Sequence, residues 1–220
     1  MKNPLLLALF IIGLSLFIIF YMVSAWLYKK RHQVTYHFYQ MFPYEFNYPS
    51  SFKENLYGNI IFVLACLSIS AFYIVNPLSS LYNTLAMVFA ILTTMILICL
   101  VLIPVRYLRT HIIISSLSMG LSTLLPLFNL FIALEESKQV LEGNKALYIV
   151  SMVISGLLAL MMVLLILNPK LTFKIYLDKA QDSSGNEVLK RPSIIYIALN
   201  EWWAILTFIL SPLALLFLFI

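Results

Sequence analysis

The chain has 220 residues, of which 62% are hydrophobic and only 10% are charged, and its formal net charge is +5. A soluble domain is usually about half apolar and about a quarter charged, because polar groups must cover its surface. This composition excludes an ordinary soluble fold. It predicts an integral membrane protein whose segments satisfy their backbone groups by forming helices.

Six apolar stretches approach the roughly 20 residues that a helix needs to cross the hydrocarbon core of a bilayer. The predicted helices span about residues 4–28, 58–75, 82–104, 111–134, 147–167 and 195–219. The second and fifth stretches end at Asn-Pro pairs, which stop helices. We therefore predict an all-α fold, with six transmembrane helices in a single transmembrane domain.

The basic residues fall in alternate loops. The loops after the first, third and fifth predicted helices hold eleven of the fourteen Lys and Arg residues. Because positive residues accumulate on the cytoplasmic side of membrane proteins, we expect these loops in the cytoplasm and both termini outside it. The lipid bilayer accounts for this charge pattern and nucleic acid is not an expected partner. A bacterial cytoplasmic membrane is the expected location.

The first cytoplasmic loop, residues 29–57, is unusually aromatic. Its alternating aromatic residues are Phe42, Tyr44, Phe46 and Tyr48. Aromatic rings with polar tips suit the headgroup region of a bilayer, so we predict that this loop lies at the interface or re-enters the bundle. It serves as a membrane anchor, as a docking surface for a partner subunit, or as a lid over a cavity. Residues 168–194 form the second long cytoplasmic loop, with a turn at 182–186.

Small and weakly polar residues mark the contacts between helices in lipid. Ser115, Ser118, Ser122 and Asn129 recur along one stripe of the fourth helix. The fifth and sixth helices carry comparable rows, so we expect the small-residue faces of these three helices to form the centre of the bundle. Ser118, Ser122 and Asn129 are candidates for binding in a cleft there, and the alternative is plain helix packing.

Glu201 is an ionisable residue within the last apolar stretch, where a charge is costly and marks a functional candidate. The basic residues expected at a similar depth are Arg106, Arg109 and His111. One interpretation is an interfacial ion pair between Glu201 and either arginine, with Trp202 and Trp203 as interface anchors. The other is a carboxylate that responds to protons or cations at a cytoplasmic entrance.

The sequence contains none of the motifs GxSxG, HExxH, GxxxxGKS and GxGxxG, which are typical of catalytic or nucleotide-binding sites. His32 and His37 are five residues apart, which does not suit one metal site on a helix. We therefore expect no catalytic residue, no cofactor and no metal. The leading hypothesis is a non-catalytic accessory or transport-associated subunit of a larger membrane assembly. The alternatives are a small transporter or substrate-binding subunit, with its cleft between the last three helices, and an intramembrane enzyme using Glu201 and His111.

Overall fold

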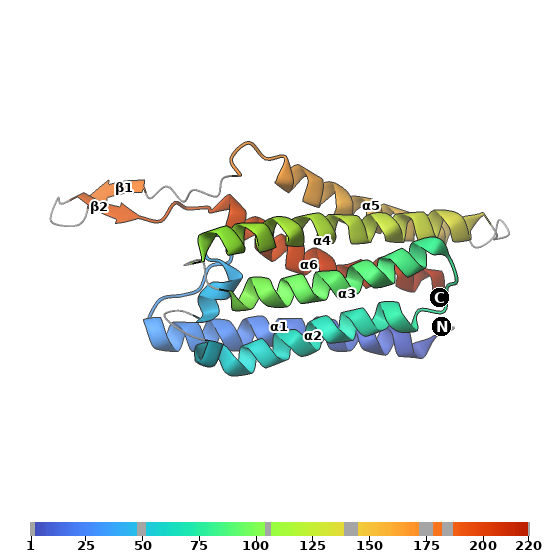
Figure 1. Cartoon of the computed structure of the whole chain (residues 1–220), viewed down its shortest axis with the longest axis horizontal. Coiled ribbons are helices and arrows are strands. Elements are labelled where there is room, and N and C mark those ends of the chain that lie inside the picture. The colour runs from blue at the N-terminus through green and yellow to red at the C-terminus, as the bar shows by residue number, and fades with distance from the viewer. Residues whose placement is uncertain are drawn as a thin grey trace.

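The computed structural model describes residues 3–47, 52–103, 107–138, 145–171, 178–181 and 187–219. In that part of the chain, six long helices pack side by side in one bundle (Figure 1). They are α1 (Pro4–His32), α2 (Leu56–Val75), α3 (Leu81–Leu102), α4 (Leu108–Ser137), α5 (Lys145–Ile166) and α6 (Tyr196–Leu216). Neighbours in the sequence run in opposite directions, so both ends of the chain lie at the same end of the bundle (Figure 1).

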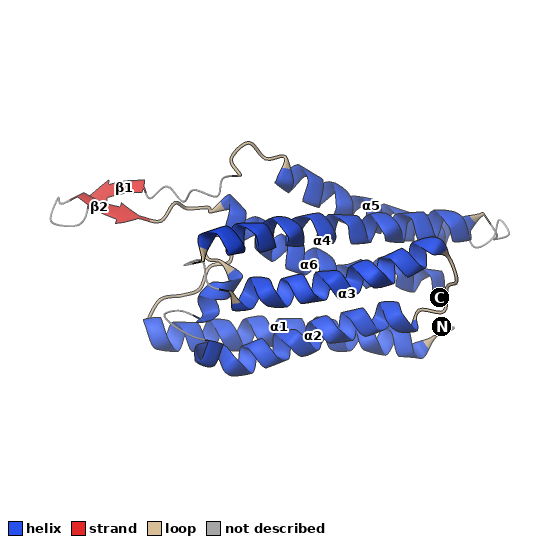
Figure 2. Cartoon of the chain, in the orientation of Figure 1, coloured by secondary structure: helices blue, strands red, loops and turns tan. Residues whose placement is uncertain are grey.

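Helix makes up nearly all of the described structure (Figure 2). The exception is a short antiparallel hairpin of β1 (Asp178–Gln181) and β2 (Glu187–Lys190), which extends beyond the bundle between α5 and α6. The predicted turn at 182–186 lies between these strands, outside the described residues.

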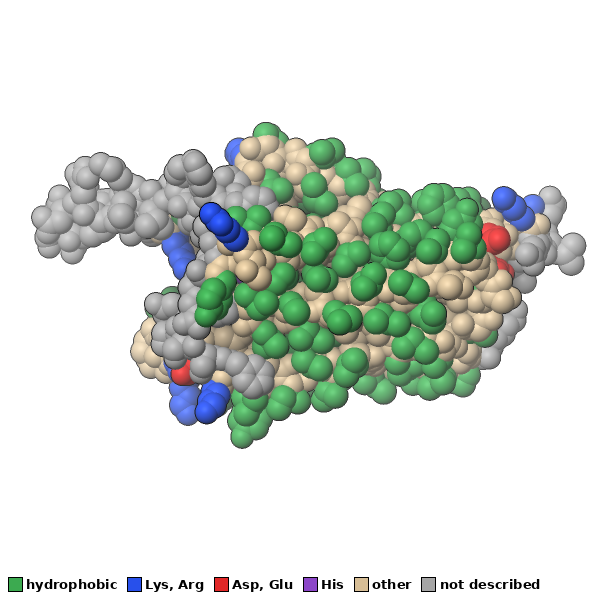
Figure 3. Space-filling model, in the orientation of Figure 1, with side chains coloured by type: hydrophobic (Ala, Val, Ile, Leu, Met, Phe, Trp, Pro, Cys, Tyr) green, Lys and Arg blue, Asp and Glu red, His purple; other side chains and the backbone are tan. Residues whose placement is uncertain are grey.

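The outer surface of the bundle is apolar over most of its length. Large hydrophobic side chains cover the face seen in Figure 3, and the charged side chains in that view lie toward the two ends. A soluble monomer does not expose so much contiguous apolar surface, whereas lipid covers it at no cost. All six helices are long and apolar enough to cross a bilayer. The prediction of an all-α membrane protein with six spanning helices is confirmed.

α6 lies at the centre of the bundle and packs against α1, α2, α4 and α5. It is the most buried of the six spans, and Ile205, Phe208 and Ile209 are fully enclosed in the apolar core. α5 lies at the outside of the bundle and buries only one narrow face, which packs against α4 and α6. That face consists of Ser151, Ser155, Ala159 and Met162.

α1 is four residues longer than predicted. Its last turn contains Lys29, Lys30, Arg31 and His32. Positive side chains near a helix C-terminus stabilise it by interacting with the helix dipole. The helix ends where Gln33 adopts a left-handed conformation with φ 56°.

The segment between α1 and α2, here called loop one (residues 33–55), folds into the end of the bundle. Its 3₁₀ helices are η1 (Pro43–Asn47) and η2 (Phe52–Asn55). η1 contacts α1, α3 and α6, and Phe46 is fully buried among them. Tyr48, predicted to belong to the same aromatic series, lies outside the described residues. The end of the bundle that loop one covers is the loop-one end.

Candidate functional site

A histidine and a glutamate meet inside the loop-one end of the bundle. α4 and α6 both begin at this end (Figure 1), so that His111 in the first turn of α4 faces Glu201 in the second turn of α6. His111 Nε2 lies 3.0 Å from Glu201 Oε1. The side chains are 4% and 0% exposed, respectively. The two residues therefore form a buried ionisable pair.

The hydrogen-bonding groups around His111 determine how many protons the pair holds. His111 Nδ1 lies 3.2 Å from the carbonyl oxygen of Ile103, and a carbonyl only accepts hydrogen bonds, so Nδ1 carries a hydrogen. A hydrogen bond between Nε2 and Glu201 then needs a second proton between those two atoms. That proton belongs either to an imidazolium facing a carboxylate or to a carboxylic acid facing a neutral imidazole. Without it, the Nε2 lone pair would face a negative oxygen.

Two aromatic rings of loop one cover the pair. The ring centroid of Tyr44 lies 5.2 Å from that of His111, and the centroid of Phe42 lies 6.0 Å away, both in edge-to-face arrangements. Phe42 is 3% exposed, so it is buried rather than offered as a surface contact. Loop one thus separates the pair from the water beyond the bundle.

A buried carboxylate anchors the covering segment. Glu45 Oε1 accepts a hydrogen bond from the Phe42 backbone N–H at 3.0 Å. Nη1 of Arg191, in the segment before α6, lies 2.9 and 3.0 Å from the two carboxylate oxygens of Glu45. The same nitrogen donates to the Gln40 carbonyl at 3.1 Å, and the Ile195 N–H donates to the Tyr39 carbonyl at 2.8 Å. Loop one is therefore held by the chain that enters α6.

Tyr36 and Trp202 connect loop one to α6. The Trp202 indole N–H donates to the Tyr36 oxygen at 3.1 Å and to the Met41 carbonyl at 3.0 Å. The Tyr36 hydroxyl donates to the Phe42 carbonyl at 2.8 Å. Burial raises the pKa of Tyr36 well above its usual value, and the charge of Glu45 raises it further, so the phenol keeps its hydrogen.

The predicted roles of the two tryptophans differ from their positions. Trp202 is 6% exposed and packs edge-on against Phe46 and Tyr21, so it is a core residue rather than an interface anchor. Trp203 is half-buried on the next position of α6. The one-residue step turns the two rings toward different sides of the helix.

The predicted ion pair between Glu201 and an arginine is not present for Arg109. Arg109 is exposed on the first turn of α4, while the Glu201 carboxylate faces His111. Arg106 lies outside the described residues. A long arginine side chain near a helix end can reach water. Arg109 therefore does not contact the Glu201 carboxylate, although the two residues were expected at a similar depth in the membrane.

The serine stripe of α4 is buried and closed. Ser118, Ser122 and Asn129 are all fully enclosed, so they do not line an open cleft in this conformation. Ser118 donates to the Ser115 carbonyl at 2.8 Å. The Asn129 amide donates to the Tyr73 oxygen and to the Ser211 carbonyl, each at 2.9 Å. Asn129 therefore connects α4 with α2 and α6.

A chain of amide hydrogen bonds fixes the other side of loop one. Asn55 donates to Ser24 Oγ at 2.9 Å, and Asn59 donates to the side-chain oxygen of Asn47 at 2.8 Å. Asn47 donates in turn to the Val101 carbonyl at 2.9 Å. These contacts join α1, α2 and α3 through loop one. The contacts of these asparagines, and those of Tyr36, Glu45 and Arg191, could not be predicted from the sequence, because the partners that join them to other helices lie far away in the chain.

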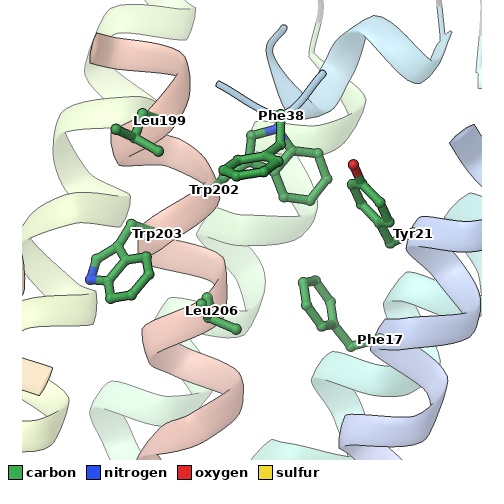
Figure 4. Close-up of a pocket in the computed structure, with 7 residues that line it drawn as sticks. All are labelled: Phe17, Tyr21, Phe38, Leu199, Trp202, Trp203 and Leu206. Carbon is green, nitrogen blue, oxygen red and sulfur yellow. The ribbon is translucent and has the colours of Figure 1, made fainter. Parts of the chain in front are cut away.

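An apolar groove of about 250 Å³ lies in the wall of the bundle between α1 and α6 (Figure 4). Its lining residues are Phe17, Tyr21, Phe38, Leu199, Trp202, Trp203 and Leu206. Almost all of this lining is hydrocarbon, so the groove suits apolar groups and gives a polar solute few hydrogen bonds.

No family model, no curated protein and no solved structure matches this chain. Within the described residues, His, Cys, Asp and Glu form no group of three or more that could hold a metal ion. The chemistry that the buried pair itself offers is the binding and release of one proton.

Proposed function

We propose that this chain is a transport-associated subunit of a membrane assembly, and that the His111–Glu201 pair is its proton-binding element. The observation that carries the proposal is the 3.0 Å contact between Nε2 and Oε1, sealed within the spanning bundle. Ionisable groups inside membrane spans are expensive and are retained mainly where they serve a function. A buried ion pair is not a strong source of stability, so packing alone does not explain it.

Release of the shared proton would change the contact directly. The Nε2 lone pair and the Glu201 carboxylate would repel each other, and the His111 ring would move against Phe42 and Tyr44. Loop one would respond, because the same segment is bonded to Trp202 through Tyr36. Histidine suits this role because its ordinary pKa is near physiological pH.

The other ionisable groups around the pair are less suited to this role. Glu45, on η1, acts electrostatically on Glu201, but Arg191 neutralises its charge. The Tyr36 phenol remains protonated, because burial raises its pKa. The Tyr44 ring packs in an edge-to-face arrangement with the His111 ring. The His111–Glu201 pair is thus the group whose charge state would change.

The loop-one end would face the cytoplasm of a bacterial cell. The segments at this end contain most of the Lys and Arg residues, which the positive-inside rule places on the cytoplasmic side. Both termini would then lie on the other side of the cytoplasmic membrane. A proton reaching the pair through loop one would therefore report cytoplasmic pH.

The outer helices would supply the contacts with partner subunits. α1 and α5 bury the smallest share of their spans within the bundle, 22% each, and their outer faces are apolar. In lipid, such faces can be covered by acyl chains or by partner helices. An assembly would use these faces, and the central α6 would remain enclosed.

An enzymatic role for the pair is the less favoured alternative. Imidazole and carboxylate can act as general base and acid, but Phe42 and Tyr44 cover His111, and Glu201 is fully buried. A reaction would need a substrate to displace loop one from the bundle.

The proposal is tested by the fluorescence of Trp202 in a Trp26→Phe/Trp203→Phe variant reconstituted in nanodiscs. This variant retains one of the three tryptophans of the chain. We expect its emission to change in one transition as pH rises, because the release of the shared proton moves loop one. The transition should be lost in the Glu201→Gln variant and retained in Glu54→Gln, which changes a loop-one carboxylate that pairs with Arg31 of α1. The same transition in Glu201→Gln would disprove the role of the pair.

A further inference from the structure

The helices α4, α5 and α6 contain an unusual number of buried polar atoms without a protein partner. Ten side-chain atoms on these helices are fully enclosed and make no hydrogen bond within the described structure. One belongs to Glu135, near the C-terminal end of α4, and the other nine belong to Ser115, Ser122, Asn129, Ser151, Ser155, Asn200, Glu201, Trp203 and Thr207. Buried polar groups are nearly always paired in native proteins, so each unpaired group needs an explanation.

Other buried hydroxyls of the same bundle do have partners. Ser70 lies 2.6 Å from the Thr94 hydroxyl, and Ser68 donates to the Leu9 carbonyl at 2.8 Å. Thr93 donates to the carbonyl four residues earlier in its own helix, as serine and threonine often do. The buried polar groups without partners are therefore concentrated where α4, α5 and α6 pack together.

The unpaired groups follow one line through the bundle. Ser151 and Ser155 lie on the only buried face of α5, which packs against α4 and α6. Ser115, Ser122 and Asn129 recur every seven residues, close to two helical turns, and so share one side of α4. From Ser115 to Asn129 the rise is about 21 Å, at about 1.5 Å per residue. The unpaired groups from Ser115 to Asn129 on α4, together with those of α5 and α6, are called the polar seam.

The seam begins at the His111–Glu201 pair. Glu201 Oε2 is the carboxylate oxygen that His111 does not contact, and it has no hydrogen-bond partner in the described structure. Ser115 lies one turn after His111 on the same side of α4, which places its hydroxyl next along the helix from the pair. At the other end, Asn129 is followed by Ile132 and Ala133, which are fully buried in the apolar core. The seam thus extends inward from the pair and ends at an apolar layer.

We propose that the polar seam holds a file of bound water, which connects the His111–Glu201 pair with Asn129 and can take up its proton. Buried water typically makes about three hydrogen bonds to groups that the protein leaves unpaired. Hydroxyl groups both accept and donate, so serine and threonine can join such a file at every step. The uptake of the proton by the water file rests on the proposed function, whereas the presence of water does not.

Proton transfer along this file needs no other reactant. The carboxyl group of Glu201 gives its proton to the first water, and each oxygen in turn accepts one hydrogen and passes another to the next. Only O–H bonds form and break. The Asn129 amide is not a base and the seam ends at an apolar layer, so the transferred proton stays on the water file as hydronium until it returns to Glu201. The process reverses when a proton returns.

The water file is tested by the exchange of thiol hydrogens with D₂O, followed by the infrared S–H band. Ser122→Cys and Ser155→Cys are made in a Cys99→Ala background, where the fully buried Cys66 is the internal reference. Ser70→Cys is the matched control, because Ser70 is buried but paired with protein groups. We expect thiols at 122 and 155 to exchange at least about tenfold faster than those at 66 and 70. Equal exchange at all four positions would show that the seam is dry.

A second variant serves if the cysteine variants do not fold. Thr207→Val removes a buried hydroxyl that has no protein partner and leaves a side chain of similar shape. If water binds this hydroxyl, its loss lowers the Tm of the protein. A Tm that is unchanged or higher would contradict the water file, because removing an unpaired polar group from a dry core does not destabilise it.

The two proposals fail separately. Slow exchange at 122 and 155, together with a Trp202 transition that depends on Glu201, would remove the water file and leave the proton-binding pair. Fast exchange without that transition would establish water in the seam and remove the pair as the element that responds to pH.

Discussion

The ring of His111 has one nitrogen with a fixed role and one with a variable role. The Ile103 carbonyl holds the hydrogen of Nδ1, so any change in protonation takes place at Nε2, opposite Glu201. A change at either partner should therefore affect the other.

A double-mutant cycle measures this dependence. We expect His111→Ala and Glu201→Ala each to lower the free energy of unfolding by about 3–5 kcal/mol, because each leaves a buried polar partner unpaired. The double variant should lose much less than the sum of the two losses. Arg31→Ala and Glu54→Ala form the control pair, which is partly exposed and should couple by no more than about 1 kcal/mol. Additive losses at 111 and 201 would show that the two residues act independently.

The sequence indicated Glu201 and His111 as candidates and combined them only in the enzyme alternative, whereas the ion pair that it predicted joined Glu201 to an arginine. Helical periodicity gives the depth of a residue along a span and leaves open which neighbouring helix it faces. His111 faces α6, whereas Arg109, two residues earlier and about 200° away around the helix, is exposed. The partners of Glu45 could not be predicted, because Arg191 is 146 residues away in the chain.

At the scale of elements, loop one is held in place by the segment that precedes α6. The Phe42 backbone N–H donates to Glu45, and Glu45 is bound by Arg191. Loss of the Glu45 charge should therefore loosen the cover over His111 and leave the helices intact.

Hydrogen–deuterium exchange of the Phe42 amide tests this. In Glu45→Gln we expect exchange to become about tenfold faster, which corresponds to about 1.4 kcal/mol of lost protection. Lys53→Gln changes an exposed charge on the same loop and should have no effect. If Phe42 remains fully protected in Glu45→Gln, the ion pair with Arg191 does not hold the loop.

The existence of the six helices was predictable because each needs only a long apolar stretch, which the sequence shows directly. Their ends were less predictable, since charged residues such as Lys29 and Lys30 extend α1 beyond the apolar stretch. The inward fold of loop one depends on distant hydrogen bonds, such as the one from Asn47 to Val101. Aromatic content suggested that this loop leaves water, but it could not place the loop against His111.

For the whole molecule, the even number of spans places both termini at one end of the bundle and loop one at the other (Figure 1). The charge pattern predicts that loop one faces the cytoplasm. Under the proposed function, the sidedness determines which compartment would supply the proton.

Cysteine labelling in intact cells tests the sidedness. In a Cys66→Ala/Cys99→Ala background, Lys30→Cys should react with a membrane-impermeant maleimide only after the cells are opened, and Lys138→Cys should react from outside. Lys30 lies at the end of α1 near loop one and Lys138 at the far end of α4. The opposite pattern would reverse the orientation, and labelling of both positions from one side would contradict an odd number of spans between them.

The central claim is that one proton is shared between His111 Nε2 and Glu201. Nitrogen-15 NMR of histidine-labelled protein observes it directly, since the chain has three histidines and a His111→Gln variant assigns the relevant signal. We predict that Nδ1 of His111 keeps its hydrogen at every pH at which the protein is folded. The Nε2 hydrogen should be lost in one step as pH rises, and Glu201→Gln should abolish or shift that step. An Nε2 without hydrogen at every pH, or a titration that Glu201→Gln leaves unchanged, would contradict the account.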